Sequence, residues 1–326
     1  MRILAGDVGG TKTLLAIYEH DASGTTTELR RERFASRAYA SLSEVLRAFL
    51  GAGSPGVSRV AFGVAGPVVD GRCAATNLPW RIDARELASD LDVERVRLIN
   101  DFHAVALGIG VLDASELVVL QDAPIVDGAP VAIVGAGTGL GEAVLLPSRD
   151  GPTVLATEGG HADFAPRNEV EMALLRFLLG RHSRVSYERV LSGPGIVTLW
   201  EFVTSTGLAP ALDSTRARLA SEDGPAVIGA LALSGGDPAA TRAVELFVSL
   251  YGAEAGNLAL KVLPYGGLYV AGGIAGKLLA PMREGAFMRS FLDKGRMRPL
   301  LERVRVAVVA TPDVGLIGAR TAAERQ

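Results

Sequence analysis

Two glycine-rich turns, each placed between two short apolar runs, constrain this chain more than any other feature of its sequence. The first turn, GDVGGTKT, occupies residues 6–13, and the second, GAGTGLG, occupies residues 135–141. Because glycine has no Cβ and tolerates positive φ, turns of this kind can bring several backbone N–H groups close to one anion. The pair therefore indicates two phosphate-binding turns, whereas either turn alone would equally suit a tight β-hairpin without a ligand.

The apolar run after each turn separates these turns from two common nucleotide-binding motifs. Each apolar run ends at further turn signals, at 19–24 and 147–151, so we expect each run to form a strand. The dinucleotide-binding fingerprint requires a helix after its glycines and is therefore disfavoured. The Walker A pattern is absent as well, because Ala271 and Leu278 stand where its first glycine and its Ser/Thr would be.

The composition is typical of a soluble globular enzyme. Of the 326 residues, 48% are hydrophobic and 21% are charged, and the length suits two domains, each with its own core. A net charge of −3 gives no sign of a nucleic acid or an anionic membrane surface as a partner. The single cysteine, Cys73, excludes a disulfide framework and a cysteine-based zinc site.

No segment of the sequence resembles a signal peptide or a membrane span. No apolar run approaches about 18 residues, the length that a membrane helix needs. The first apolar strand residues begin directly after Arg2, so we expect no leader segment. A cytoplasmic location is therefore the default expectation.

The rest of the sequence alternates helix and strand signals, which predicts an α/β fold. Asp83 and Glu86 have the spacing of a capping box at a helix start. Asn168 and Glu171 repeat that spacing, and Thr311–Pro312 suits the start of a closing helix. No linker-like stretch separates the halves of the chain. We expect helices over 42–50, 82–91, 168–179 and 238–261, and strands over 59–64, 96–99, 267–271 and 304–309.

An aspartate after the strand 96–99 is the strongest candidate for catalysis. Asp101 stands between that strand and a helix, which is where α/β folds build their sites. Its carboxylate could accept a proton from a substrate hydroxyl. The alternative is that Asp101 caps the helix, but Ala104 stands where a capping box would need Glu or Gln.

A second aspartate, Asp7, lies inside the first glycine turn. A carboxylate among groups arranged for anions is unexpected unless a cation intervenes, and Mg²⁺ that bridges phosphates would supply one. The alternative is an aspartate that caps its own turn. The position of Asp7 therefore suggests a metal-assisted phosphate site.

Two further segments carry residues that can bind hydroxyl groups. Glu158 and His161 flank a pair of glycines, and a carboxylate with an imidazole can bind vicinal hydroxyls by accepting and donating hydrogen bonds. Metal binding is the other possibility, although the chain has only four histidines and no cysteine cluster. Glu188 precedes the string SGPG at 192–195, and on its own it suits a solvated helix charge.

Taken together, these strings resemble bacterial glucokinases of the hexokinase-like group, within the sugar kinase/actin/Hsp70 superfamily. The resemblance runs nearly end to end and rests on separated blocks in the right order. The blocks are LINDF at 98–102, GAGTGLG at 135–141, EGGHADFAP at 158–166, ERVLSGPG at 188–195 and AGGI at 271–274. The family implies an α/β fold of two ribonuclease H-like (actin-like ATPase) domains, duplicated, around a central cleft. The small domain would be 1–111 plus 302–326, and the large domain 112–301.

The resemblance implies ATP-dependent phosphorylation of glucose at its 6-hydroxyl, the entry to glycolysis. Asp101 would be the general base, with Asn100 beside it on the sugar. Further contacts to glucose hydroxyls are implied for Asn77, Glu158, His161 and Glu188. This role replaces the interpretation of Glu188 as a solvated charge.

The resemblance also implies that the glycine-rich turns bind ATP together with Mg²⁺. Asp7 would hold the metal through water. The phosphates and the adenosine would contact Gly6, Asp7, Val8, Gly9, Gly10, Thr11, Gly137, Thr138, Gly139, Gly272 and Gly273. The partners expected are glucose and a second copy of the chain in a homodimer, with no nucleic acid and no membrane.

Several related activities are alternatives at this point. A kinase for another hexose, or a non-catalytic sugar sensor of the same fold, would keep the same hydroxyl-binding residues, and polyphosphate or ADP could replace ATP as donor. An actin-like or Hsp70-like ATPase would have no need of Glu158 and His161. The related ROK group carries a cysteine-rich zinc motif that is absent here, and its repressors have an N-terminal DNA-binding segment for which we expect no room.

Overall fold

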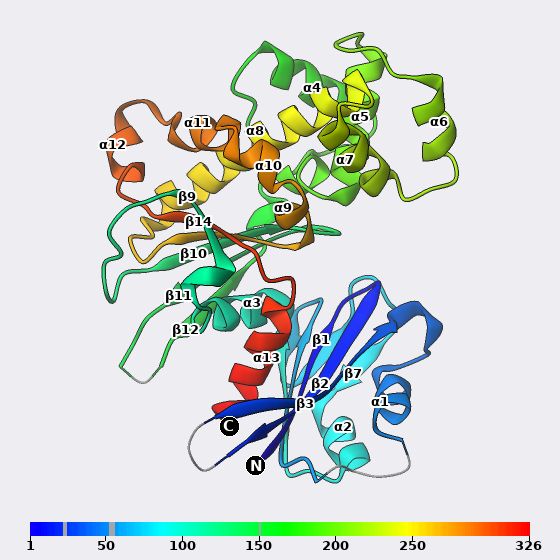
Figure 1. Cartoon of the computed structure of the whole chain (residues 1–326), viewed down its shortest axis with the longest axis vertical. Coiled ribbons are helices and arrows are strands. Elements are labelled where there is room, and N and C mark those ends of the chain that lie inside the picture. The colour runs from blue at the N-terminus through cyan, green and yellow to red at the C-terminus, as the bar shows by residue number, and fades with distance from the viewer. Residues whose placement is uncertain (22–24, 52–55, 150) are drawn as a thin grey trace. The chain divides into compact units, whose positions relative to one another are not determined.

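The chain folds as an α/β protein with two compact units (Figure 1). The computed structural model describes residues 1–21, 25–51, 56–149 and 151–326. The turns expected at 19–24 and 147–151 lie partly outside the described residues. Unit 1 comprises Met1–Asp113, Val154–Ala156 and Asp313–Gln326, and unit 2 comprises Ala114–Thr153 and Thr157–Pro312.

Unit 1 is built on a five-stranded mixed sheet in the order β3-β2-β1-β4-β8. Its strands are β1 (Arg2–Val8), β2 (Lys12–His20), β3 (Thr26–Ala35), β4 (Arg59–Val64) and β8 (Val96–Asn100). β1 and β2 form an antiparallel hairpin, β4 runs parallel to β1, and β8 runs parallel to β4. Val8 pairs with Val64, and Val64 pairs with Asn100, so the carboxyl ends of the three parallel strands lie side by side.

Two helices of unit 1 come into very close contact. Unit 1 has four α-helices in all: α1 (Leu42–Leu50), α2 (Ala84–Leu91), α3 (Asp101–Ile109) and α13 (Val314–Glu324), counted over the described residues. A small sheet contains β5 (Val68–Val69), β6 (Arg72–Ala74) and β7 (Arg81–Asp83). The two helices in close contact are α3 and α13. α3 and α13 approach so closely that a Cβ added to Gly318 would lie 1.6 Å from the carbonyl oxygen of Ala104. Glycine at 318 therefore allows α13 to hold α3, the helix that begins with Asp101.

Unit 2 contains a six-stranded sheet in the order β12-β11-β10-β13-β14-β9. Its strands are β9 (Leu117–Gln121), β10 (Val131–Ala136), β11 (Leu140–Leu146), β12 (Thr153–Thr157), β13 (Leu268–Ala271) and β14 (Val306–Val309). Residues Val154–Ala156 of β12 are nevertheless grouped with unit 1. β10 and β11 form an antiparallel hairpin around the second glycine turn, and β13 pairs in parallel with β10 and with β14. A strand follows each glycine turn, as predicted, which excludes the dinucleotide-binding arrangement at both turns.

The long helix α8 (Pro238–Val262) forms the centre of the unit 2 core. It packs against α5, α7, α11 and β10. The other helices are α4 (Glu169–Leu179), α5 (Gly193–Ser205), α6 (Asp213–Leu219), α7 (Gly224–Ser234), α9 (Gly273–Lys277), α10 (Leu279–Arg283), α11 (Ala286–Leu292) and α12 (Arg298–Leu301). Short 3-10 helices include η3 (Gly159–His161) and η4 (Tyr187–Arg189). No helix in the described part of the chain, α8 included, has both the length and the apolarity to cross a membrane.

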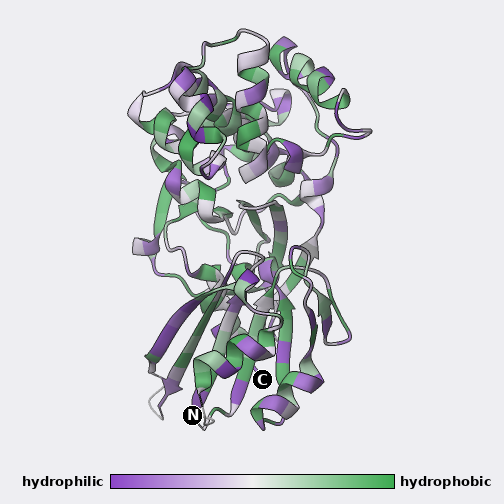
Figure 2. Ribbon diagram, turned by 90° about the vertical axis from the view of Figure 1, so that its right-hand side faces the viewer, coloured by the Kyte–Doolittle hydropathy of each residue, from purple (hydrophilic) through white to green (hydrophobic). Residues whose placement is uncertain are grey.

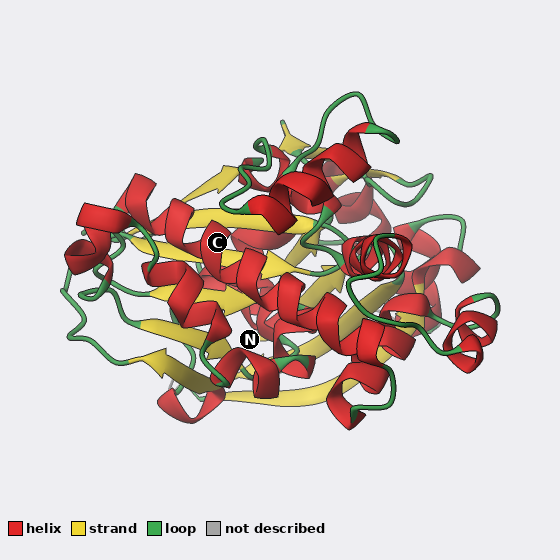
Figure 3. Cartoon of the chain, turned by 90° about the horizontal axis from the view of Figure 1, so that it is seen from above, coloured by secondary structure: helices red, strands yellow, loops and turns green. Residues whose placement is uncertain are grey.

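The buried hydrophobic side chains lie where helices pack on the sheets. Figure 3 shows the helices in red beside the strands in yellow. Hydrophobic residues, green in Figure 2, follow the strands and the helices that pack on them, and each unit has its own buried clusters. Most residues with candidate chemistry lie instead at strand ends and in the segments that follow them, whereas Glu188 lies in η4.

Most of the predicted helices and strands are confirmed, with small shifts at their ends. The helix with the first capping box begins at Ala84, two residues later than expected, because Asp83 is its N-cap. The closing helix begins at Val314 rather than at 311–312, and Asp313 precedes it. Both differences concern the residue at which a helix starts, where a local signal is least specific.

The end of the chain divides differently from our expectation. We expected 302–326 to join 1–111 in one domain. β14 lies within that range, yet it pairs with β13 and with β9 in the sheet of unit 2. Unit 2 therefore extends to Pro312, and only Asp313–Gln326 joins unit 1.

Candidate active site

The first glycine turn joins β1 to β2 and touches the loop that carries Asn77. The N–H of Gly9 donates to the carbonyl oxygen of Lys12 at 2.9 Å and closes the turn. A Cβ added to Gly10 would lie 2.6 Å from the Cβ of Asn77, so the two segments are in contact. Thr11 is exposed at the tip. The predicted phosphate turn and a predicted sugar loop thus adjoin in unit 1.

Two other predicted phosphate-binding residues belong to strand β1 rather than to the tip of the turn. A Cβ added to Gly6 would lie 2.6 Å from Cδ1 of Phe62, so glycine is needed there for packing on β4. Val8 is 2% exposed and lies in the hydrophobic core. Neither residue offers a side chain to a ligand, and a contribution from either would have to come from its backbone.

Asp7 is half-buried at the end of β1, beside the start of α13. A Cβ added to Gly315 would lie 3.2 Å from Oδ2 of Asp7. Burial raises the pKa of Asp7, Lys12 opposes that shift, and the charge of Asp313 adds to it. One carboxylate oxygen of Asp313 pairs with the guanidinium group of Arg31, and the other oxygen is buried without a hydrogen-bond partner. Two neighbouring carboxylates with an unpartnered oxygen suit a hard cation such as Mg²⁺.

Asn100, rather than Asp101, is the N-cap of α3. Its Oδ1 accepts hydrogen bonds from the N–H groups of Phe102 and His103, at 2.9 and 3.2 Å. Its Nδ2 donates to the carbonyl oxygen of Gly66 at 3.1 Å and ties β8 to the loop after β4. These bonds fix the head of α3, and one Nδ2 hydrogen stays available for a sugar hydroxyl.

Capping by Asn100 leaves the carboxylate of Asp101 free for chemistry. Its Oδ1 accepts a hydrogen bond from the N–H of Phe102 at 2.9 Å. Burial raises the pKa of Asp101 to about 6, although the bond from Phe102 opposes the shift, and the charge of Asp7 raises it further. At neutral pH the carboxylate is therefore ionised yet more basic than an exposed aspartate, which suits a general base.

The second glycine turn, between β10 and β11, is held by Glu188 of η4. The N–H of Gly137 donates to the carbonyl oxygen of Gly139, and the N–H of Gly193 donates to that of Gly137, both at 2.8 Å. The N–H of Leu140 donates to Oε2 of Glu188 at 3.0 Å. A Cβ added to Gly139 would lie 2.3 Å from the same oxygen. Glu188 is therefore not a solvated helix charge, because it supports the turn.

The structure brings Glu158, His161 and Glu188 together in unit 2. Nδ1 of His161 lies 3.9 Å from Oε1 of Glu188, and its Nε2 lies 3.9 Å from Oε2 of Glu158. The exposed fractions of the side chains are 78% for Glu158, 54% for His161 and 33% for Glu188. These distances exceed those of hydrogen bonds, so the polar groups stay available to ligand hydroxyls.

Gly272 and Gly273 follow β13 and differ in their surroundings. Gly272 has a φ of 85°, and a Cβ there would lie 2.4 Å from the carbonyl oxygen of Ala136, so only glycine fits. Gly273 begins α9, and a Cβ there would meet open space. Gly272 thus shapes the junction with β10, whereas Gly273 presents the open backbone that was predicted to border adenosine.

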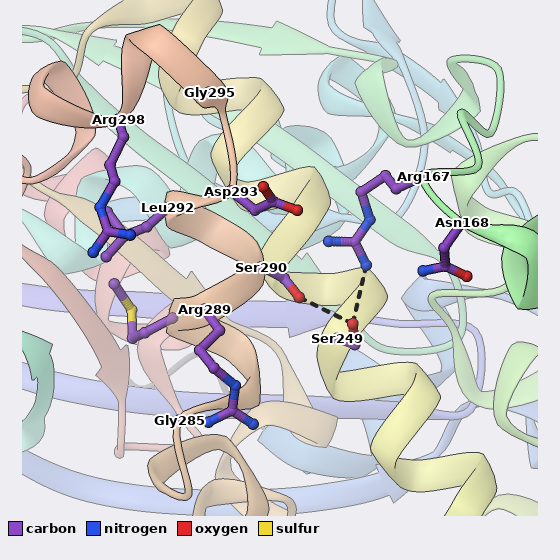
Figure 4. Close-up of a pocket in the computed structure, with 11 residues that line it drawn as sticks. Arg167, Asn168, Ser249, Gly285, Arg289, Ser290, Leu292, Asp293, Gly295 and Arg298 are labelled. Carbon is purple, nitrogen blue, oxygen red and sulfur yellow. Dashed lines mark hydrogen bonds between the residues drawn. The ribbon is translucent and has the colours of Figure 1, made fainter.

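A cavity of about 850 Å³ in unit 2 contains none of these residues (Figure 4). Arg167 donates to Ser249, and the hydroxyl of Ser249 shares a hydrogen bond with that of Ser290, as the dashed lines show. Arg167 also pairs with Glu171, so its charge is neutralised within the protein. The predicted site residues of each unit therefore lie outside this cavity.

Comparison with known proteins identifies the family. A sequence model described as glucokinase matches residues 4–326. The chain belongs to the glucokinase family. It is 43% identical over 338 aligned residues to a glucokinase of Trichormus variabilis, with 99% of each chain covered.

Solved structures show the same relationship. The crystal structure of a glucokinase from an Antarctic psychrotroph matches with a TM-score of 0.83 and 30% identity, over 100% of this chain and 99% of the other. A ROK family glucokinase from Streptomyces griseus, solved with glucose and AMPPNP, matches with a TM-score of 0.69 and 23% identity over the whole of both chains. The second likeness concerns the fold alone.

Proposed function

We propose that this chain transfers the γ-phosphoryl group of ATP to the 6-hydroxyl of glucose, with Asp101 as the general base. Glucose phosphorylation is the activity of the family to which the chain belongs. The role of Asp101 is carried by one observation: its half-buried carboxylate stands at the head of α3, while the side chain of Asn100 caps the helix. A carboxylate in this position is spared for proton transfer.

Asp101 would accept the proton of the 6-hydroxyl as the hydroxyl oxygen attacks the γ-phosphorus. The new O–P bond forms, the bond between that phosphorus and the bridging oxygen breaks, and ADP leaves. A pKa of about 6 keeps Asp101 ionised at neutral pH and still able to take the proton. Phosphoryl transfer otherwise depends on positioning and on charge neutralisation, so the remaining residues would hold the reactants.

Glucose would be held by the cluster of Glu158, His161 and Glu188, with Asn77 and Asn100 as further ligands. The carboxylates would accept hydrogen bonds from sugar hydroxyls, and the imidazole and amides can donate or accept them. The 3.9 Å distances within the cluster support this role, because they leave its polar atoms unpaired with one another. The proposal requires that residues of both units bind the same sugar.

The backbone N–H groups of the two glycine turns would bind the phosphates of ATP, with Gly273 near the adenosine. The Streptomyces griseus structure contains an ATP analogue, which supports ATP as the donor. Asp7 would hold Mg²⁺ through water, with Asp313 beside it, and the metal would supply positive charge against the phosphates. One or two carboxylates are enough for such a site, so a cluster of three protein ligands is not needed.

We further propose that units 1 and 2 are two ribonuclease H-like domains, the small and the large one, related by duplication. The support is a shared strand pattern: in each unit a hairpin surrounds the glycine turn, and its first strand pairs in parallel with a later strand. A homodimer is also proposed from the family resemblance, and light scattering in solution tests it.

A coupled assay tests the proposed reaction and its specificity. The protein is incubated with glucose, mannose, fructose or N-acetylglucosamine, using ATP and then polyphosphate as donor. We expect the highest kcat/KM with glucose and ATP. Preference for another hexose, or for polyphosphate, would correct the substrate or the donor.

Replacing Glu158 with Gln is expected to weaken glucose binding by about tenfold, because hydrogen bonds to a charged acceptor contribute about 1.5–3 kcal/mol. Calorimetry with glucose measures the change. Glu245→Gln is a matched control, since Glu245 is exposed on α8 and pairs with Arg242. Unchanged affinity in Glu158→Gln would remove Glu158 from the sugar site.

A further inference from the structure

Two glutamates that the proposed mechanism does not use lie next to each other in the core of unit 2. Glu142, in β11, is 2% exposed, and Glu254, in α8, is 0% exposed. Their carboxyl groups interact, and the Oε1 atom of each is buried without a hydrogen-bond partner. Two buried carboxylates are unfavourable unless they share a proton or have other partners, so their presence requires an explanation.

The charges around the pair show where its proton resides. Burial and, next, the charge of Glu254 raise the pKa of Glu142 from 4.5 to about 8, against the effect of Lys261. Burial also raises the pKa of Glu254, but the hydrogen bond from Asn257 and the charges of Lys261 and Lys294 oppose that shift. At neutral pH Glu142 is therefore protonated, and Glu254 carries the negative charge.

Glu142 lies against η3, the segment of the sugar cluster that contains His161 and follows Glu158. A Cβ added to Gly159 would lie 1.9 Å from Oε2 of Glu142, so the carboxyl group contacts the backbone of η3. Oγ1 of Thr157 donates to the carbonyl oxygen of Glu142 at 3.2 Å and accepts from the N–H of Gly159 at 3.1 Å. A displacement of Glu142 would therefore be transmitted to η3.

Glu254 is linked to η4, the segment that carries Glu188. Nδ2 of Asn257 donates to Oε2 of Glu254 at 2.9 Å and to the hydroxyl oxygen of Tyr187 at 3.0 Å. Nζ of Lys294 donates to Oδ1 of Asn257 at 2.7 Å and fixes the orientation of the amide. Tyr187 is 3% exposed and immediately precedes Glu188. One buried carboxyl pair thus connects both segments of the sugar cluster.

We propose that Glu142 and Glu254, together with Asn257, position η3 and η4 for glucose, and that they do so only while Glu142 is protonated. The inference rests on the proposed role of η3 and η4 in sugar binding. Loss of the proton would place two negative charges side by side in the core, and their repulsion would displace Glu142 from Glu254 and from η3. Both glutamates are therefore positioning residues that act through the sugar-binding segments.

The two tyrosines that face the pair do not account for a change between pH 7 and 9. Burial raises the pKa of Tyr187 to about 12, and it also raises the pKa of Tyr251. Burial lowers the pKa of Lys294 from its ordinary value of 10.5. The charged or titratable neighbours are Lys261 and Tyr251 of α8, Tyr187 of η4, Lys294 after α11, and Glu158 and His161 at η3.

The sign of the pH effect follows from the direction of the shift. Because the pKa of Glu142 is raised in the folded state, the folded protein binds this proton more tightly than the unfolded chain does. Its contribution to stability is fully present below the ordinary pKa of 4.5 and is lost as pH rises through about 8. Glucose affinity is expected to fall in the upper part of that window.

Calorimetric titration with glucose at pH 7 and pH 9 tests the proposal. For the unmodified protein, we expect the Kd for glucose to rise by about five- to tenfold between these pH values, since the protonated fraction falls about tenfold per pH unit above the pKa. kcat is expected to change little. Glu142→Gln keeps a neutral donor toward Glu254 at every pH, so its Kd should be the same at both.

The control is Glu171→Gln, which replaces another buried glutamate of unit 2 that is paired with Arg167. We expect this variant to melt at a lower temperature and to keep the rise in Kd. A Kd that does not change with pH in the unmodified protein would overturn the proposal, and so would a persistent rise in Glu142→Gln. Absence of glucose binding at both pH values would instead overturn the proposed function itself, and the inference with it.

Discussion

Replacing Asp101 with Asn is expected to lower kcat for glucose by about 10²–10⁴-fold, the range for loss of a general base, while glucose still binds. The amide has nearly the same shape, and its oxygen can still accept the hydrogen bond from Phe102 that Asp101 accepts at 2.9 Å. It cannot take the proton of the 6-hydroxyl. A coupled assay measures kcat, and calorimetry measures the affinity for glucose.

The control for this variant is Asp83→Asn, because Asp83 caps α2 in the same unit through a hydrogen bond from the N–H of Arg85. An asparagine can cap a helix as well as an aspartate does, so kcat should be unchanged. A nearly normal kcat in Asp101→Asn would exclude Asp101 as the base. Loss of glucose binding would show that the substitution disturbs the sugar site instead.

Replacing Gly318 with Ala is expected to have the largest effect on stability. The added Cβ would lie 1.6 Å from the carbonyl oxygen of Ala104 and 2.9 Å from the N–H nitrogen of Gly108. Both obstacles are backbone atoms of α3, so α13 would have to move away as a whole. Overpacking of this kind costs about 1–3 kcal/mol and occasionally more, and we expect about 3 kcal/mol in urea-induced unfolding.

A helical glycine without close neighbours provides the matched control. A Cβ added to Gly229, in α7, would meet no atom within 4 Å. Gly229→Ala should therefore stabilise the protein by up to about 1 kcal/mol, because alanine restricts the unfolded chain. Equal effects of the two substitutions would contradict the account of close packing between α3 and α13.

Features that depend on neighbouring residues could be predicted from the sequence. Asp83 and Asn168 are the N-caps of α2 and α4, as predicted. Asn168 accepts from the N–H of Glu171, the capping-box position, whereas Asp83 accepts from the N–H of Arg85, one residue earlier. The strands after both glycine turns were predicted because their apolar runs end at new turn signals. The family was predicted from short strings that occur in a fixed order. The match of the glucokinase model to residues 4–326 confirms it.

Features that depend on contacts between distant residues could not be predicted. The bond from the N–H of Leu140 to Glu188 joins residues 48 positions apart, and no local pattern marks it. The neighbouring position of Asp7 and Asp313 likewise joins opposite ends of the chain. Asp313 was overlooked because Thr311–Pro312 before it already satisfied the signals for a helix start, and only the register of α13 shows where the helix begins.

The pH dependence of kcat/KM for glucose between pH 5 and 8, measured for the unmodified protein and for Asp101→Asn, shows whether Asp101 is the general base. This parameter reports the titration of essential groups in the free enzyme. The account predicts that kcat/KM of the unmodified protein falls below an apparent pKa of about 6, the value expected for Asp101, and that this acid limb is absent from the variant. An acid limb that persists in the variant, or a flat profile in the unmodified protein, would contradict it.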